Sequence, residues 1–138
     1  MLDWLWTEKN YEGFPLFLRR PTNLDIDSLR PCFPQLVAIT HTFAKRMPNG
    51  LPEVDYNHGL AELDHSLIIS FDIDHMGVPV LIETFGGKRN YYFYVSADAD
   101  IEAVVSQAAQ RFPSERLSST TELDQNWSFI TKYVKEHF

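Results

Sequence analysis

The sequence predicts an α+β domain built around an antiparallel sheet. Several short segments alternate apolar and polar residues, two longer segments carry apolar side chains at helical spacing, and turns rich in glycine and proline separate them. From residue 35 onward the predicted order is strand, helix, strand, strand, helix, strand. This order predicts a ferredoxin-like βαββαβ sandwich, extended by an N-terminal β-hairpin and a C-terminal helix.

Length and composition predict one domain over residues 1–138. The chain has 138 residues, of which 44% are hydrophobic and 14% aromatic, enough to form a substantial core and to exclude disorder. No internal repeat and no linker-like tract interrupts it. We expect an N-terminal hairpin at 1–21, a ferredoxin-like core at 35–123 and a C-terminal helix at 124–138.

The first strands are predicted from alternation. Leu2, Trp4 and Trp6 alternate with other residues, the turn-prone segment 10–13 follows, and an apolar run resumes at 14–18, as in a hairpin. Prolines make the next stretch irregular. Residues 36–43 are rich in β-branched side chains and predict a buried strand.

A single helix of about five turns is predicted to begin at Pro52, because proline is favoured in the first turn. Its apolar stripe consists of Tyr56, Leu60, Leu63, Leu67 and Phe71, at spacings of three and four.

The second half of the chain shows the same kinds of strand and helix pattern. Strands at 78–85 and 90–95 flank a loop at 86–89, and Asp98 or Asp100 caps a helix over 101–112 that ends before Pro113. Residues 116–123 predict an edge strand. A final helix follows Asp124 and buries an apolar face; that face consists of Trp127, Ile130 and Val134.

In the predicted sandwich, right-handed crossovers place both long helices on one face of the sheet. The other face then needs a cover. The aromatic run 91–95 resembles the stacking strand of RNA-recognition domains, but the glycine and small residue of their signature are missing. We therefore expect core packing there, with the hairpin burying Trp4 and Trp6 against this aromatic face.

Charge and apolar runs limit the partners. The net charge of −7 disfavours phosphate backbones, and so bulk binding of nucleic acid. No apolar run approaches the ~18 residues needed to span a bilayer, and the N-terminus lacks the pattern of a secretory signal. The one cysteine, Cys32, cannot form an internal disulfide, and we expect it to be a packing residue. A reducing cytoplasm is the expected location.

Three short motifs carry a family resemblance. They are Asn49-Gly50-Leu51-Pro52, the segment from Thr84 to Val95, and Asp124-Gln125-Asn126-Trp127. The chain from about Trp4 to Tyr133 resembles the bacterial domain of unknown function family 695, which has no established activity. Through its distant similarity to the type B protein regulator of ribonuclease E, the resemblance implies a regulator that binds a protein.

Metal and cofactor sites receive little support. His58, Glu62 and His65 lie on one side of the predicted first helix and could supply three ligands, yet no further ligand is evident. A solvated polar face is the expected alternative. No phosphate-binding glycine motif, zinc motif or nucleophile motif is present, so we expect no cofactor and no catalytic residues.

Topology predicts two oppositely charged ends of the sheet. One end is predicted to form a basic, anion-binding rim of Lys45, Arg46, Lys88, Arg89, Arg111 and Arg116. The opposite end is predicted to bind a partner through Asp72, Asp74, Asp98, Asp100, Glu122 and Asp124. Charges scattered over solvated loops are the alternative.

These features predict a non-enzymatic, acidic, cytoplasmic protein that binds or regulates a protein partner. Three alternatives stay open at this stage. The protein could be an immunity protein that neutralises a toxin, an RNA-binding module that uses the basic rim, or an uncharacterised enzyme. Whether it is a monomer or a dimer is left open by the sequence.

Overall fold

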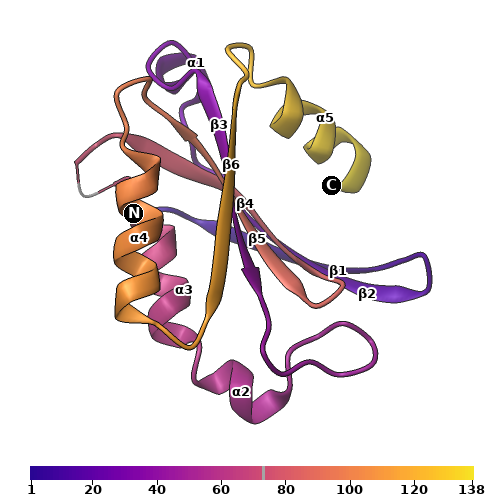
Figure 1. Cartoon of the computed structure of the whole chain (residues 1–138). Coiled ribbons are helices and arrows are strands. Elements are labelled where there is room, and N and C mark those ends of the chain that lie inside the picture. The colour runs from indigo at the N-terminus through magenta and orange to yellow at the C-terminus, as the bar shows by residue number, and fades with distance from the viewer. Residues whose placement is uncertain (73) are drawn as a thin grey trace.

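The computed structural model describes residues 1–138 with the exception of residue 73. The strands are β1 (Trp4–Tyr11), β2 (Phe14–Pro21), β3 (Gln35–Thr42), β4 (Gly77–Phe85), β5 (Lys88–Val95) and β6 (Arg116–Leu123). The helices are α1 (Ile26–Leu29), α2 (Val54–His58), α3 (Ala61–Ile68), α4 (Ile101–Arg111) and α5 (Ser128–His137). The chain is thus a mixed α+β structure, as the sequence predicts (Figure 1).

All strands join one antiparallel sheet. It is six-stranded, with the order β1-β2-β4-β5-β3-β6. The predicted hairpins β1–β2 and β4–β5 form, and β6 is an edge strand. The β4–β5 connection is shorter than the predicted loop, because Gly86 and Gly87 both adopt positive φ and close a two-residue turn.

The N-terminal hairpin extends the sheet edge to edge and does not cover a face. Strand β2 pairs with β4 only through Phe17, Leu18 and Arg19. The expectation that the hairpin buries its tryptophans is therefore wrong for Trp6, whose exposed fraction is 67%. The reason is that backbone pairing satisfies the open N–H and C=O groups along β4, which a face-on hairpin would leave unpaired.

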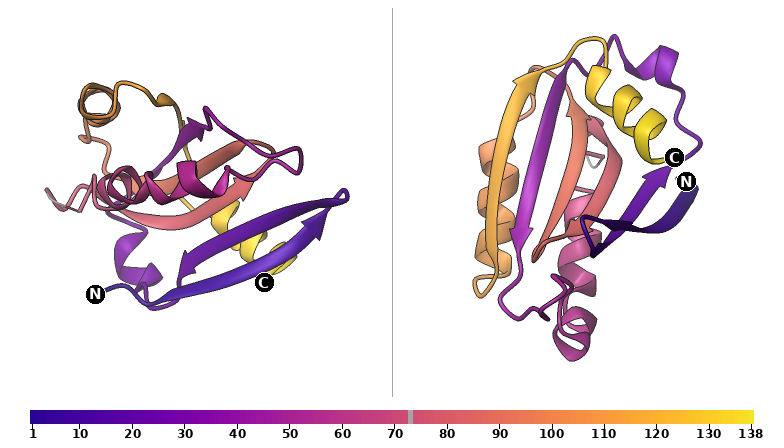
Figure 2. Two further views of the ribbon diagram at one scale, coloured as in Figure 1. Left: turned by 90° about the horizontal axis from the view of Figure 1, so that it is seen from below. Right: turned by 90° about the vertical axis from the view of Figure 1, so that its right-hand side faces the viewer.

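Two apolar cores lie on opposite faces of the sheet. Helices α3 and α4 cover one face and α5 covers the other (Figures 1 and 2). Alternation along β5 divides its aromatic residues between them, so that Tyr91 and Phe93 face α3 and α4 while Tyr94 faces α5. The C-terminal helix is thus the cover of the second face. Its anchor is Trp127, which is fully buried and stacks on Tyr94 with ring centroids 4.2 Å apart.

The helix predicted as one unit over 52–71 is two helices. Gly59 and Leu60 interrupt it, and their N–H groups donate to the carbonyls of Tyr56 and Asn57, each at 3.1 Å, in tighter i to i−3 bonds. Glycine weakens a helix interior, which favours the break at this position. Leu60, Leu63, Leu67 and Phe71 are buried, as the stripe predicts, whereas Tyr56 is half-buried. The stripe did not predict the break between the two helices.

The other helices begin and end close to their predicted positions. Asp100 accepts a hydrogen bond from the Ala103 N–H at 3.1 Å and caps α4. Asp124 accepts hydrogen bonds from the Ser128 and Phe129 N–H groups, each at 3.0 Å, and so caps α5. Helix α1 is a short turn in the stretch that the sequence predicts as irregular. Among the described residues, no helix has the length and apolar content needed to cross a bilayer.

We expect Leu63→Ala to lower the free energy of unfolding by about 2 to 4 kcal/mol, since Leu63 is 1% exposed and the substitution leaves a cavity under α3. Urea denaturation followed by circular dichroism measures this change. The neighbouring exposed substitution Glu62→Ala is the control and should change stability by no more than about 0.5 kcal/mol. Equal midpoints for both variants would contradict the packing of α3 on the sheet.

Candidate functional site

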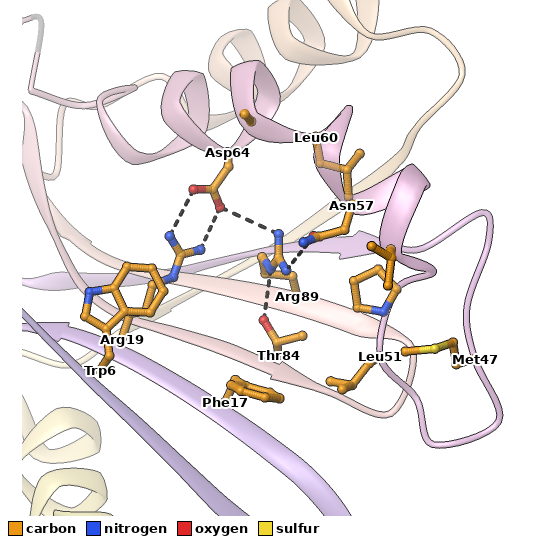
Figure 3. Close-up of a pocket in the computed structure, with 13 residues that line it drawn as sticks. Trp6, Phe17, Arg19, Met47, Leu51, Asn57, Leu60, Asp64, Thr84 and Arg89 are labelled. Carbon is orange, nitrogen blue, oxygen red and sulfur yellow. Dashed lines mark hydrogen bonds and ion pairs between the residues drawn. The ribbon is translucent and has the colours of Figure 1, made fainter.

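A pocket of about 470 Å³ lies where the N-terminal hairpin meets the α2–α3 segment and the β4–β5 hairpin (Figure 3). Its walls are apolar and its base is charged. The lining residues are Trp6, Phe17, Arg19, Met47, Leu51, Pro52, Val54, Asn57, Leu60, Ala61, Asp64, Thr84 and Arg89. Its volume is within the range of small-molecule and peptide sites.

Strand register brings the polar residues of the pocket onto one face of the sheet. Trp6 lies opposite Arg19 in the β1–β2 pair, and Phe17 lies opposite Thr84 in the β2–β4 pair. Thr84 in turn lies opposite Arg89 in the β4–β5 pair. Because directly paired residues project to the same side, these side chains form one row beneath α3.

The carboxylate of Asp64, on α3, is the centre of the polar base. Its oxygens accept hydrogen bonds from the Arg19 Nη1 and Nη2 groups at 2.9 and 2.6 Å, a two-point ion pair between α3 and β2. Tyr91 donates its hydroxyl to the same carboxylate at 2.6 Å. This network joins the hairpin, the helix and the centre of the sheet.

The charge state of this network follows from its contacts. Burial by itself raises the pKa of the Asp64 carboxyl, but the hydrogen bonds and charge of Arg19, with Tyr91 and Arg89, outweigh it and hold this pKa below its ordinary value. Burial and the neighbouring Asp64 charge raise the pKa of the Tyr91 phenol. Asp64 is therefore an anion and Tyr91 a neutral donor at pH 7.

Arg89 gives the pocket a second guanidinium. Its Nε donates to the Thr84 hydroxyl at 2.9 Å, its Nη2 donates to the side-chain Oδ1 of Asn57 at 3.3 Å, and its Nη1 lies 3.8 Å from Asp64 Oδ1. Two arginines and one aspartate leave one net positive charge at the base. Since Arg19 already occupies both oxygens of Asp64, that charge resides mainly on Arg89.

The apolar wall is formed by the turn from Met47 to Leu51. Gly50 has φ of +88°, and a Cβ there would lie 2.9 Å from the Gly86 backbone nitrogen. The Gly87 N–H donates to the Gly50 carbonyl at 2.8 Å. Glycine thus permits a close approach of two turns, which holds Met47 and Leu51 over the pocket.

A second buried network lies beyond the pocket and uses His41, Tyr56 and Glu115. His41 Nε2 lies 2.8 Å from Glu115 Oε1, and the Tyr56 hydroxyl donates a short hydrogen bond to the same oxygen. Burial lowers the pKa of His41 despite the opposing effect of Glu115, so the imidazole is neutral at pH 7 and donates its Nε2 proton. Burial, with the hydrogen bond to Glu115, raises the pKa of Tyr56 to about 12. This network ties β3 to α2 and to the loop before β6.

The structure places the predicted acidic residues at one end of the sheet, where Gln35, Gly77, Val95 and Leu123 lie in register. Asp72, Asp74, Asp98 and Glu122 are exposed there. Helix α1 lies at the same end (Figure 1), with Asp27 exposed in its first turn and the exposed Asp25 as its N-cap. Asp100 and Asp124 also lie at this end, but their carboxylates are used as helix caps. Asp124 additionally accepts the Tyr94 hydroxyl at 2.7 Å.

The predicted basic residues lie at the opposite end, where Thr42 pairs with Lys88 and with Arg116. Their side chains differ in environment. Lys45, Lys88 and Arg116 are exposed, whereas Arg89 points into the pocket. Arg46 and Arg111 are exposed as well, with Arg46 folded over the Gly86–Gly87 turn and Arg111 over the Phe112 ring.

The weak metal candidates do not share one helix. His58 ends α2, while Glu62 and His65 belong to α3, beyond the break at Gly59. All three are exposed. Within the part of the chain that the structure describes, no three histidine, cysteine or acidic side chains form a group that could hold a metal. The expectation that Cys32 is a packing residue is wrong: Cys32 is exposed, and its N–H donates to the Leu29 carbonyl at 3.0 Å in the turn that follows α1.

Sequence reasoning missed Trp6, Arg19 and Asp64 as site residues. Two signals were available. A hairpin closed at residues 12–13 pairs Trp6 with Arg19, and arginine over an aromatic ring is a common cross-strand contact; here the distance from the guanidinium to the ring is 5.0 Å. Asp64 lies four residues after Leu60 and three before Leu67, so helical spacing places its charge beside the apolar stripe, which predicts an ion-pair partner.

The fold and pocket define this protein as a mixed α+β domain with a cavity at the junction of an added hairpin and the main sheet. The chain belongs to the family of unknown function DUF695, whose sequence profile matches residues 3–134. The predicted family resemblance is thereby confirmed. Comparisons with curated proteins and with solved structures found no match.

We expect Asp64→Asn to lower the free energy of unfolding by about 3 kcal/mol, because it leaves the partly buried Arg19 and Arg89 without their carboxylate. Urea denaturation at pH 7 measures this loss. Glu62→Gln removes an exposed negative charge from the same helix and should change stability by no more than about 0.5 kcal/mol. A loss as small as that of the control would show that the network does not hold the hairpin.

We also expect stability to fall on acidification in two stages. The folded-state pKa of His41 is lowered, so the unfolded chain takes up this proton first, near pH 6.5, and stability decreases as the pH falls below that value. The pKa values of Asp64 and Glu115 are also lowered, and their contributions are lost below about pH 4. Urea denaturation at pH 7, 5.5 and 3.5 tests this.

The variant His41→Gln keeps an N–H donor for Glu115 but cannot be protonated. It should lack the first stage of the loss and keep the second. A wild-type free energy of unfolding that stays constant between pH 7 and 5.5 would contradict the neutral, buried state of His41.

Proposed function

We propose that this protein is a non-enzymatic binding domain that recognises a protein partner through the pocket between its N-terminal hairpin and α3. The observation that carries the proposal is the composition of the pocket. An apolar wall surrounds a base with one uncompensated positive charge, which is suited to holding an anionic group attached to an apolar body.

The exposure of the pocket mouth supports a macromolecular partner. Trp6 and Val54 line the pocket and have exposed fractions of 67% and 61%. Exposed tryptophan and arginine are the residues that contribute most to binding at protein interfaces. A partner segment that enters the pocket would cover both.

The state of the polar side chains supports binding rather than catalysis. The Asp64 carboxylate has a lowered pKa and accepts hydrogen bonds from two residues, so it is a poor general base. The Thr84 hydroxyl accepts a hydrogen bond from Arg89, and among the described residues none accepts a hydrogen bond from it as a general base would. On these grounds we propose that the pocket binds a partner and does not catalyse a reaction.

The acidic end is a second candidate surface for the same function. Six exposed carboxylates, of Asp25, Asp27, Asp72, Asp74, Asp98 and Glu122, lie at one end of the sheet. Such a surface would dock a basic partner, as a regulator of an RNA-processing enzyme or an immunity protein would. We also propose that the protein is distantly similar to the type B regulator of ribonuclease E and that it is located in the cytoplasm.

The proposed architecture of the core is the ferredoxin-like sandwich. Its support is the order β4-β5-β3-β6 with β3 and β5 in the middle, and the packing of α3 and α4 on the same face. In this description the β1–β2 hairpin and α5 are additions, and the pocket lies at the boundary between the hairpin and the core.

The test compares partner capture by tagged variants in native lysate, quantified by mass spectrometry. Val54→Glu places a negative charge at the exposed pocket mouth and should abolish capture of proteins enriched by the wild type. Thr120→Glu adds the same negative charge at an exposed residue in the middle of β6, away from the pocket and the acidic end, and should retain them. Thermal unfolding of both variants confirms that each is folded.

A third variant neutralises the acidic end through Asp72→Asn, Asp98→Asn and Glu122→Gln. If this variant loses the captured proteins while Val54→Glu keeps them, the acidic end replaces the pocket as the docking surface. Capture that is unchanged in all three variants refutes both surfaces.

A further inference from the structure

We propose that the pocket binds the C-terminal carboxylate of a polypeptide whose last side chain is apolar, with Arg89 as the residue that pairs with the carboxylate. The inference rests on the proposed function and specifies the chemistry of its partner. It follows from the charge at the base of the pocket, the unused hydrogen-bonding capacity of Arg89, and the apolar wall above it.

The charge at the base matches one negative charge. Arg19 and Asp64 neutralise each other in a two-point ion pair, so a ligand meets the charge of Arg89. A carboxylate would balance that charge, whereas a phosphate with a charge of about −1.5 to −2 would place excess negative charge beside Asp64. The base therefore selects a carboxylate over a phosphate.

Arg89 has donors to offer. A guanidinium carries five N–H donors, and Arg89 uses one in a short hydrogen bond, from Nε to Thr84 at 2.9 Å. The contacts of its Nη groups with Asn57 and Asp64 are longer, at 3.3 and 3.8 Å. Its planar group is held in place by Phe43, whose ring centroid lies 5.3 Å from the guanidinium carbon. A fixed, incompletely paired guanidinium is suited to two-point binding of a carboxylate.

The apolar wall specifies what is attached to the carboxylate. Phe17, Leu51 and Val54 line the same pocket as Arg89, and Figure 3 shows Phe17 and Leu51 together with Arg89. A C-terminal residue carries its carboxylate and its side chain on the same carbon, so an apolar side chain can reach this wall while the carboxylate reaches Arg89. Aspartate and glutamate side chains present a carboxylate on a short stem, which leaves the apolar wall in contact with water.

The depth of the pocket agrees with a terminal residue rather than a continuing chain. Arg89 is close to buried, with a side-chain exposed fraction of 12%, while Trp6 at the mouth is 67% exposed. A chain end can reach an enclosed arginine, and the preceding residues can pass over Trp6. A continuing chain would have to enter and leave through the same mouth.

The experiment measures binding of the peptide acetyl-Ser-Gly-Leu-Phe by calorimetry, as the free acid and as the C-terminal amide. The acid should bind, and the amide should bind at least about tenfold more weakly, because it lacks the charge that pairs with Arg89. A peptide acid ending in aspartate should also bind at least about tenfold more weakly. Equal affinity of acid and amide would overturn the proposal, as would binding of neither.

Matched variants assign the carboxylate to Arg89. Arg89→Gln should reduce affinity for the peptide acid at least about tenfold and leave affinity for the amide unchanged. Lys88→Gln removes the same charge from the neighbouring exposed residue and should change the affinity for the acid less than about twofold. A loss of similar size in both variants would mean that general charge attraction, rather than Arg89, holds the ligand.

Free 4-phenylbutanoate distinguishes a small acid from a chain end. It shares the carboxylate and the apolar body but lacks the peptide, and should bind more weakly than the peptide acid. If it binds as tightly, the ligand is a small carboxylic acid and the polypeptide source is wrong. If Val54→Glu loses the captured partners but the wild type does not bind the peptide acid, this inference alone is wrong. If Val54→Glu captures the same proteins as the wild type, the proposed function of the pocket is itself wrong.

Discussion

The ion pair between Arg19 and Asp64 is the contact on which the pocket depends. The hairpin joins the main sheet through only three residue pairs of β2 with β4, so pairing alone leaves its angle to α3 weakly defined. A carboxylate held at two points by a guanidinium adds a directional constraint between strand and helix. Tyr91 extends that constraint to the centre of the sheet. The shape of the pocket therefore depends on the ion pair and the hydrogen bonds that the Asp64 carboxylate makes.

The two faces of the sheet show how the same strands support two different cores. Alternation along β5 gives one face to α3 and α4 and the other to α5, whose Trp127 stacks on Tyr94 and donates its indole N–H to the Phe33 carbonyl at 2.8 Å. Because α5 covers the second face, the hairpin does not need to cover it. The hairpin is left to extend the edge, and its Trp6 is left beside the pocket.

Local patterns predicted the strands and the terminal helices well, because alternation, capping and turn residues act over a few positions. Asp124 was identified as a cap, Asp98 or Asp100 was expected to cap the helix over 101–112, and residues 116–123 were identified as an edge strand. The break at Gly59 was missed because Leu60 continues the helical spacing of Leu63 and Leu67 across it.

The pocket was missed for a different reason. Arg19 and Asp64 lie 45 residues apart in the sequence, and Asp64 and Arg89 lie 25 residues apart. Only the hydrogen-bonded register and the helix packing bring them together. Arg89 was placed correctly at its end of the sheet, but a rim position does not reveal that its side chain turns inward.

The position of β3 has a consequence for how the chain reaches this structure. Its neighbours in the sheet are β5 and β6, both of which come much later in the sequence. Strands β1 and β2, and likewise β4 and β5, are joined by tight turns and can pair as soon as they are synthesised. Strand β3 has no such local partner, so its apolar residues Val37 and Ile39 stay unpaired until residues 88–95 and 116–123 have been made. Closing those long loops costs more chain entropy than closing a hairpin, which makes docking of β3 a late step of folding. During that interval β3, which ends up between β5 and β6 in the finished sheet, is the segment most exposed to association with other chains.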